Sequence, residues 1–171
     1  EGNRGGTENV PYIVAFGRAA ELARAISTQS RQKLAALRDS LENEIFSKIP
    51  GTSRNGAREP RLPNTTSISF TGVDAEALLM MFDQLGICAS SGSACTTGSV
   101  APSHVLTAMQ LNPTEARSTI RFSLDYETTP EDVAFLMSHL PRLITELRSA
   151  ASPRTAARLT SSKPALAAQA M

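Results

Sequence analysis

The segment Thr66-Ser67-Ile68-Ser69-Phe70, followed by Asp74 and an apolar run, indicates the kind of fold that this chain adopts. The segment alternates in polarity and carries β-branched side chains, which is typical of a half-buried strand. Asp74 is suited to cap a helix that contains Ala77, Leu78, Leu79, Met81 and Phe82. Gly86 ends that helix. A strand joined to a capped helix in this way predicts an α/β fold.

Outward toward the N-terminus, apolar residues recur at three- and four-residue spacings from Val10 to Ile49. This period predicts a long amphipathic helix with a break near residues 27–30. Residues 51–63 are rich in Gly, Arg, Asn and Pro and lack an apolar period, so we expect a surface connection there.

Outward toward the C-terminus, the pattern predicts further short elements. Residues 87–89 and 118–124 are strand candidates, and 90–99 is a small, polar loop. A helix is expected from Pro102 through Met109, and a polar connection over 112–117.

Thr129 is the expected N-cap of a last helix, with Pro130 in its first position, that runs to about Arg148. The sum is an α+β domain over residues 10–150, with about three short strands, antiparallel or mixed, covered on one face by helices. Residues 151–171 have no convincing period, and we expect a flexible tail.

The bulk composition excludes several classes of protein. A hydrophobic content of 41% is enough for a core, and the 17 basic and 16 acidic residues are interspersed, which argues against nucleic acid as a partner. No segment approaches the roughly 20 apolar residues of a membrane span. Two cysteines seven residues apart predict neither a disulfide framework nor a metal site, and favour a cytoplasmic protein. The chain begins at Glu1 without methionine, so we expect a fragment of a longer polypeptide.

Cys95 lies among small, polar residues and is the first candidate for chemistry. A nucleophilic cysteine needs a lowered pKa, and neither His nor Lys adjoins Cys95 in the sequence. The residues alone therefore leave a nucleophile and a chance cysteine equally open. Cys88, on an apolar strand candidate, is expected to be buried and inert.

Two further residues have alternative interpretations. Arg121 lies on a predicted strand, where it could bind a carboxylate ligand or pair with an acid such as Asp125. Thr7 follows two glycines, and the simplest interpretation is an N-cap for the long helix. The two histidines, His104 and His139, are expected to be surface or capping residues, and we assign neither to a site.

The segment Ser90-Ser91-Gly92-Ser93-Ala94-Cys95-Thr96-Thr97-Gly98-Ser99, with Pro102-Ser103-His104 after it, resembles the active-site loop of NifS/IscS-type cysteine desulfurases. These enzymes belong to the class V aminotransferases of PLP fold type I. The resemblance extends from residue 4 to about 148 and includes the blocks Arg4-Gly5-Gly6-Thr7-Glu8-Asn9, Arg61-Leu62-Pro63-Asn64-Thr65 and 118–124.

The resemblance implies a function and a set of site residues. It implies that the whole protein uses pyridoxal 5'-phosphate (PLP) to convert L-cysteine to L-alanine, with Cys95 receiving the sulfur as a persulfide. Arg121 would hold the substrate carboxylate, and Thr7 would contact the PLP phosphate of the neighbouring subunit of a homodimer. A sulfur-acceptor or scaffold protein for Fe–S cluster assembly would be the partner.

The chain also departs from the family pattern. Its lysines are Lys33, Lys48 and Lys163, and none lies in the family's Ser-x-His-Lys context. Residues 1–9 would then be a loop from a missing PLP-binding large domain, and the fragment alone should be inactive. A selenocysteine lyase-like PLP enzyme and a sulfur-carrier or dimerisation module without PLP are the alternatives.

Overall fold

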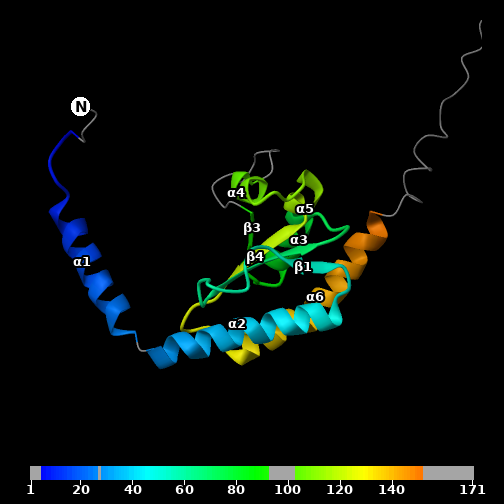
Figure 1. Ribbon diagram of the computed structural model, residues 1–171, viewed down its shortest axis with the longest axis horizontal. Helices are drawn as coiled ribbons and strands as arrows, with labels where there is room; N and C mark the ends of the chain where they lie inside the picture. The colour runs from blue at the N-terminus through cyan, green and yellow to red at the C-terminus, as the bar shows by residue number, and fades with distance from the viewer. Residues whose placement is uncertain (1–4, 27, 93–102, 152–171) are drawn as a thin grey trace, which may run out of the picture.

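The computed structural model describes residues 5–26, 28–92 and 103–151. Two helices come first, α1 (Val10–Ala25) and α2 (Thr28–Lys48). The chain between them is extended at Ile26, so the predicted helix and its break are both confirmed. None of the residues in α1 is buried, and Figure 1 shows this helix standing apart from the sheet.

A sheet forms the centre of the fold. It contains four strands among the described residues, in the order β1 (Thr52–Arg54), β2 (Thr65–Phe70), β4 (Thr119–Ser123) and β3 (Ser90–Ser91). Every pairing between these strands is antiparallel. The predicted α/β fold is confirmed, and the strands are antiparallel rather than mixed.

Helix α2 and two further helices, α3 (Ala75–Gln84) and α6 (Pro130–Ala150), share one hydrophobic core with the sheet. Figure 1 shows α2 and α6 running side by side along the sheet. Asp74 and Thr129 cap α3 and α6, as predicted, and Asp132 completes a capping box with Thr129. The fully buried side chains at the centre include Ile45, Ile68, Phe70, Leu78, Phe82, Ile120 and Leu140.

The structure corrects the sequence analysis at three places. Strand β1 lies inside the expected surface connection 51–63. It was not predicted because pairing with β2 stabilises this edge strand, and its sequence has no apolar pattern. Residues 87–89 form no strand, and β3 begins at Ser90, where pairing with β4 starts.

The third correction is a short helix in the polar connection 112–117. Helix α5 (Pro113–Arg117) follows α4 (His104–Ala108). Asn112 and Glu115 make a reciprocal capping box around its first turn, which explains why a polar segment becomes helical. Within the part of the chain that the structure describes, no helix has the length and apolar character needed to cross a membrane.

Candidate active site

Arg121 occupies the centre of a polar row across three strands. Its register partners are Ser67 on β2 and Ser90 on β3. Residues directly opposite one another share a face of the sheet, and the neighbours Ile120 and Phe122 are buried in the core. The row therefore lies on the face opposite the core helices.

Within residues 5–26, 28–92 and 103–151, the guanidinium of Arg121 makes no hydrogen bond or ion pair, and the side chain is half-buried. The alternative partner, Asp125, instead accepts a 2.8 Å hydrogen bond from the backbone N–H of Glu127. Pairing of Arg121 with Asp125 is thus not observed. A planar cation held on a strand with its donors available is suited to a carboxylate.

A network of amide and hydroxyl groups fixes the same face beside Arg121. The amide nitrogen of Asn55 donates to the hydroxyl oxygens of Ser67 and Thr119, at 3.2 Å each. Ser69 donates to the amide oxygen of Asn55 at 3.1 Å and lies 2.9 Å from the Thr119 hydroxyl. Thr119 also bonds the Glu115 carbonyl at 2.8 Å. The network joins β2, β4 and α5 two residues from Arg121.

Thr7 is exposed and is not the N-cap of α1. That position belongs to Asn9, whose side-chain oxygen accepts a 3.3 Å hydrogen bond from the backbone N–H of Tyr12. The capping interpretation of Thr7 is therefore wrong. Thr7 comes before α1, and that helix stands apart from the sheet that carries Arg121 (Figure 1).

Cys95 lies in segment 93–102, outside the described residues. Its described flanks are Gly92, directly after β3, and Ser103, directly before α4.

Cys88 is exposed, which contradicts the expectation of a buried thiol. Ile87 and Ala89 pack against the core, whereas Cys88 between them does not. His139 is exposed on α6, as expected, with Nδ1 2.9 Å from the Phe135 carbonyl oxygen.

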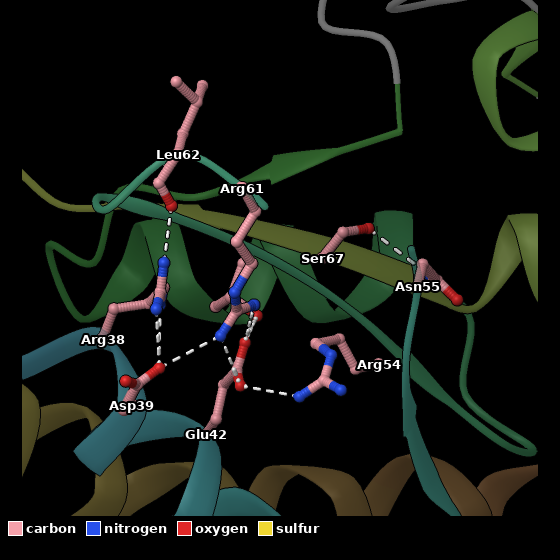
Figure 2. Close-up of polar contacts among 9 residues, drawn as sticks. Arg38, Asp39, Glu42, Arg54, Asn55, Arg61, Leu62 and Ser67 are labelled. Atoms are coloured by element: carbon pink, nitrogen blue, oxygen red, sulfur yellow. Dashed lines mark hydrogen bonds and ion pairs between the residues drawn. The ribbon is translucent and has the colours of Figure 1, made fainter. Parts of the chain in front are cut away.

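A buried cluster of charges lies at the other side of the sheet, and the sequence analysis missed it (Figure 2). Arg61 donates to both oxygens of Glu42 and, at 3.0 Å, to Asp39. Arg54 donates to Glu42 at 3.2 Å, and Arg38 donates to Asp39 at 2.7 Å. These five residues tie α2 to β1 and to the connection before β2.

Glu42 is the centre of this cluster, and its side chain is 4% exposed. Burial alone would raise its pKa, but hydrogen bonds from Arg61, Thr66 and Arg54, together with the charge of Arg61, lower the pKa to about 2. The hydrogen bond to Glu42 in turn raises the pKa of Arg61. The sequence contained one sign of this cluster: Arg38 and Glu42 occupy the same helix face as the buried Leu41 and Ile45. The cluster is a structural element that fixes the strands.

The described residues do not fit the reactive end of PLP. Lys33 is exposed on α2, and Lys48 pairs with Glu44 at 2.6 Å on the same helix, so neither reaches the polar row around Arg121. Lys163 lies beyond the part that the structure describes. Within its described part, this chain therefore has an arginine at the row but no lysine there to hold the cofactor.

Comparison with known families accounts for this partial site. A family model described as aminotransferase class-V matches residues 2–136. The chain belongs to this family. The class-V match covers the polar row, the flanks of segment 93–102 and Thr7.

The curated relatives are considerably longer than this chain. A cysteine desulfurase from Nostoc sp. is 47% identical over 148 residues, which are 86% of this chain and 37% of the relative. The cysteine desulfurase NifS of Azotobacter vinelandii is 42% identical over 148 residues, which are again 86% of this chain and 37% of the relative. The chain therefore spans about 37% of the length of the curated relatives that it matches.

Solved structures agree on the fold. A NifS-like protein from Rickettsia africae superposes with a TM-score of 0.71 at 35% identity, over 83% of this chain and 36% of that protein. The cysteine desulfurase CsdA from Escherichia coli gives a TM-score of 0.64 at 19% identity, over 84% of this chain and 32% of that protein, and supports the fold alone.

Proposed function

We propose that this chain is the C-terminal part of a PLP-dependent cysteine desulfurase, which converts L-cysteine to L-alanine and leaves a persulfide on Cys95. The observation that carries the proposal is the available guanidinium of Arg121, because Arg121 pairs directly with Ser90 on β3, the strand that leads into the Cys95 segment. The similarity to relatives named cysteine desulfurase supports the choice of reaction.

Arg121 binds the carboxylate of L-cysteine through paired N–H donors. Such charge-assisted hydrogen bonds are about twice as strong as neutral ones and fix the orientation of the substrate. Ser67 and Ser90 flank the guanidinium on the same face and limit the directions from which the carboxylate approaches. The hydrogen-bonded network around Asn55 keeps this face rigid.

Cys95 acts as a thiolate that attacks the sulfur of the bound cysteine. A sulfur–sulfur bond forms on Cys95, the carbon–sulfur bond of the substrate breaks, and its electron pair stays with carbon. A proton added to that carbon gives the methyl group of alanine, so no external oxidant or reductant is needed. PLP, held mainly by the part of the relatives that this chain does not span, supplies the electron sink that makes the carbon–sulfur bond labile.

Thr7 completes the site of a second subunit in a homodimer by donating to the PLP phosphate. Its exposure supports a role outside its own domain. The persulfide then passes to a sulfur-acceptor protein for Fe–S cluster assembly in the cytoplasm.

The test uses the full-length protein loaded with PLP. L-cysteine is added, alanine is quantified, and the cysteine that carries the additional sulfur is located by peptide mass spectrometry. Alanine with a persulfide on Cys95 supports the proposal. A chain that accepts sulfur from another enzyme but forms no alanine would favour a sulfur carrier, and preference for selenocysteine over cysteine would favour a lyase.

A further inference from the structure

The direction of the hydrogen bonds around Asn55 follows from the groups that they join. A hydroxyl group has one proton, and the Thr119 hydroxyl donates its proton to the Glu115 carbonyl oxygen at 2.8 Å. Thr119 must therefore accept the 3.2 Å hydrogen bond from Asn55, so the Asn55 atom that faces it is the amide nitrogen, Nδ2. The amide oxygen of Asn55 accepts from Ser69 at 3.1 Å, which agrees with this orientation. The orientation of the Asn55 amide is thus fixed.

This orientation decides the role of the Ser67 hydroxyl. Nδ2 of Asn55 also donates to Oγ of Ser67 at 3.2 Å (Figure 2), and an amide NH2 group cannot accept a hydrogen bond in return. The backbone N–H of Asn55 donates to the Ser67 carbonyl oxygen at 2.8 Å, so the two residues are joined twice. Among the residues that the structure describes, no atom accepts the proton of the Ser67 hydroxyl. Ser67 is therefore an oriented donor whose proton is unused.

The unused proton of Ser67 lies beside the donors of Arg121. The two residues are register partners on β2 and β4, and the Cβ atoms of such partners are about 4.5–5.5 Å apart on one face of a sheet. A guanidinium has no acceptor, so Ser67 cannot donate to Arg121. Both side chains are half-buried and within reach of a ligand. A negatively charged group with two acceptor oxygens satisfies both residues, and a carboxylate has this chemistry.

We propose that Ser67 is a second ligand of the substrate carboxylate and that Asn55 is the positioning residue that orients it. This inference rests on the proposed function, in which Arg121 holds the carboxylate of L-cysteine. Arg121 supplies the opposite charge, and Ser67 donates one further hydrogen bond to a carboxylate oxygen. Because the hydrogen bond from Asn55 already holds the Ser67 oxygen, little side-chain freedom is lost when the substrate binds.

The test compares Ser67→Ala with Ser53→Ala in the full-length, PLP-loaded protein. Ser53 is exposed on β1, which is separated from the Arg121 strand by β2, so its variant removes a hydroxyl away from the proposed ligand. Two constants are measured: KM for L-cysteine, and Kd for L-alanine by isothermal titration calorimetry, which needs no turnover. Ser67→Ala should raise both about 10-fold, as expected for one hydrogen bond to a charged group, and change kcat less than about 2-fold. Ser53→Ala should leave both constants within about 2-fold.

Asn55→Ala tests the positioning role. It should raise the same two constants about 3- to 10-fold, because the Ser67 hydroxyl loses the hydrogen bond that orients it. In a protein that already carries Ser67→Ala, the further change Asn55→Ala should alter KM and Kd by less than about 2-fold, since the hydroxyl that Asn55 orients is gone. A purely structural role of Asn55 would weaken binding equally in both backgrounds.

The outcomes separate the levels of inference. Wild-type KM and Kd in Ser67→Ala would overturn the ligand role, with or without a folded Asn55→Ala variant, and leave the proposed function standing. Equal effects of Asn55→Ala in the two backgrounds would overturn its positioning role. If the wild type binds L-alanine but forms none from L-cysteine, the proposed function fails, and Kd in Ser67→Ala still decides the ligand role. A wild type that does neither would overturn both.

Discussion

Ser90 on β3 lies directly opposite Arg121 on β4, as its antiparallel register partner. Two residues after Ser90, the chain enters the contact of Gly92 with Ser103. One short strand pair, β3 with β4, thus links the segment that carries Cys95 to the guanidinium that we propose holds the substrate. Changes at Arg121 should therefore alter substrate binding without unfolding the sheet.

Replacement of Arg121 should weaken the binding of L-cysteine. Hydrogen bonds to charged groups contribute about 1.5–3 kcal/mol, so Arg121→Ala should raise KM about 10- to 100-fold in the full-length enzyme. Arg121→Lys keeps the charge but loses the paired donors, and it should fall between the wild type and the alanine variant. Steady-state kinetics of alanine formation measure both.

Arg142→Ala is the matched control for charge. Arg142 pairs with Glu146 on an exposed face of α6, so its loss removes one positive charge away from the row. It should leave KM unchanged. An equal rise of KM in Arg142→Ala would show that net charge, and not the position of Arg121, governs binding.

Removal of the Asn55 side chain should destabilise the polar face. Asn55→Ala deletes the three hydrogen bonds to Ser67, Ser69 and Thr119, and Thr119 and Ser69 are buried. We expect a loss of about 1–3 kcal/mol and a lower Tm in thermal unfolding. Ser138→Ala, which removes an exposed hydroxyl of α6, should change stability by less than about 0.5 kcal/mol. Equal Tm values for the two variants would contradict the network's role.

Because of Glu42, the free energy of unfolding should decrease at acidic pH. Its pKa is lowered from 4.5 to about 2 in the fold, so its ionised form stabilises the folded state by about 3 kcal/mol at neutral pH. Because the folded pKa is the lower one, this contribution is complete above about pH 4.5 and is lost as the pH falls toward about 2.

Glu42→Gln isolates this contribution. Glutamine resembles protonated glutamate in shape and leaves the arginines without their counter-charge, so the variant should have a lower Tm at pH 7. The difference in Tm from the wild type should shrink at pH 3 and vanish near pH 2. Thermal unfolding across this range measures it, and a difference that is constant with pH would refute the assignment.

The predicted elements succeeded where a local signal agreed with the tertiary structure. Asp74 and Thr129 capped their helices because a side-chain acceptor and an apolar period occur together in the sequence. Strand β2 was likewise predictable, because polar and apolar residues alternate in its sequence. The short strands β1 and β3 could not be predicted, since three and two residues carry no period and their pairing partners are distant in sequence.

The candidate site was predictable in part. Arg121 was found as a charge on an otherwise uncharged strand, but its lack of a partner and its row with Ser67 and Ser90 depend on register. The exposure of Cys88 was not predicted, because its apolar neighbours suggested a strand over residues 87–89, and the structure forms none there. The proximity of Gly92 and Ser103 could not be predicted, because ten residues separate the two in sequence.

The most direct test of the account is to map the persulfide in the full-length, PLP-loaded protein after one turnover with L-cysteine. Cys88 is exposed and serves as an internal control thiol in the same molecule. We predict a mass gain of one sulfur atom on the Cys95 peptide, its absence in Cys95→Ala, and no effect of Cys88→Ala on alanine formation. Additional sulfur on Cys88, or alanine formation that survives Cys95→Ala, would contradict it.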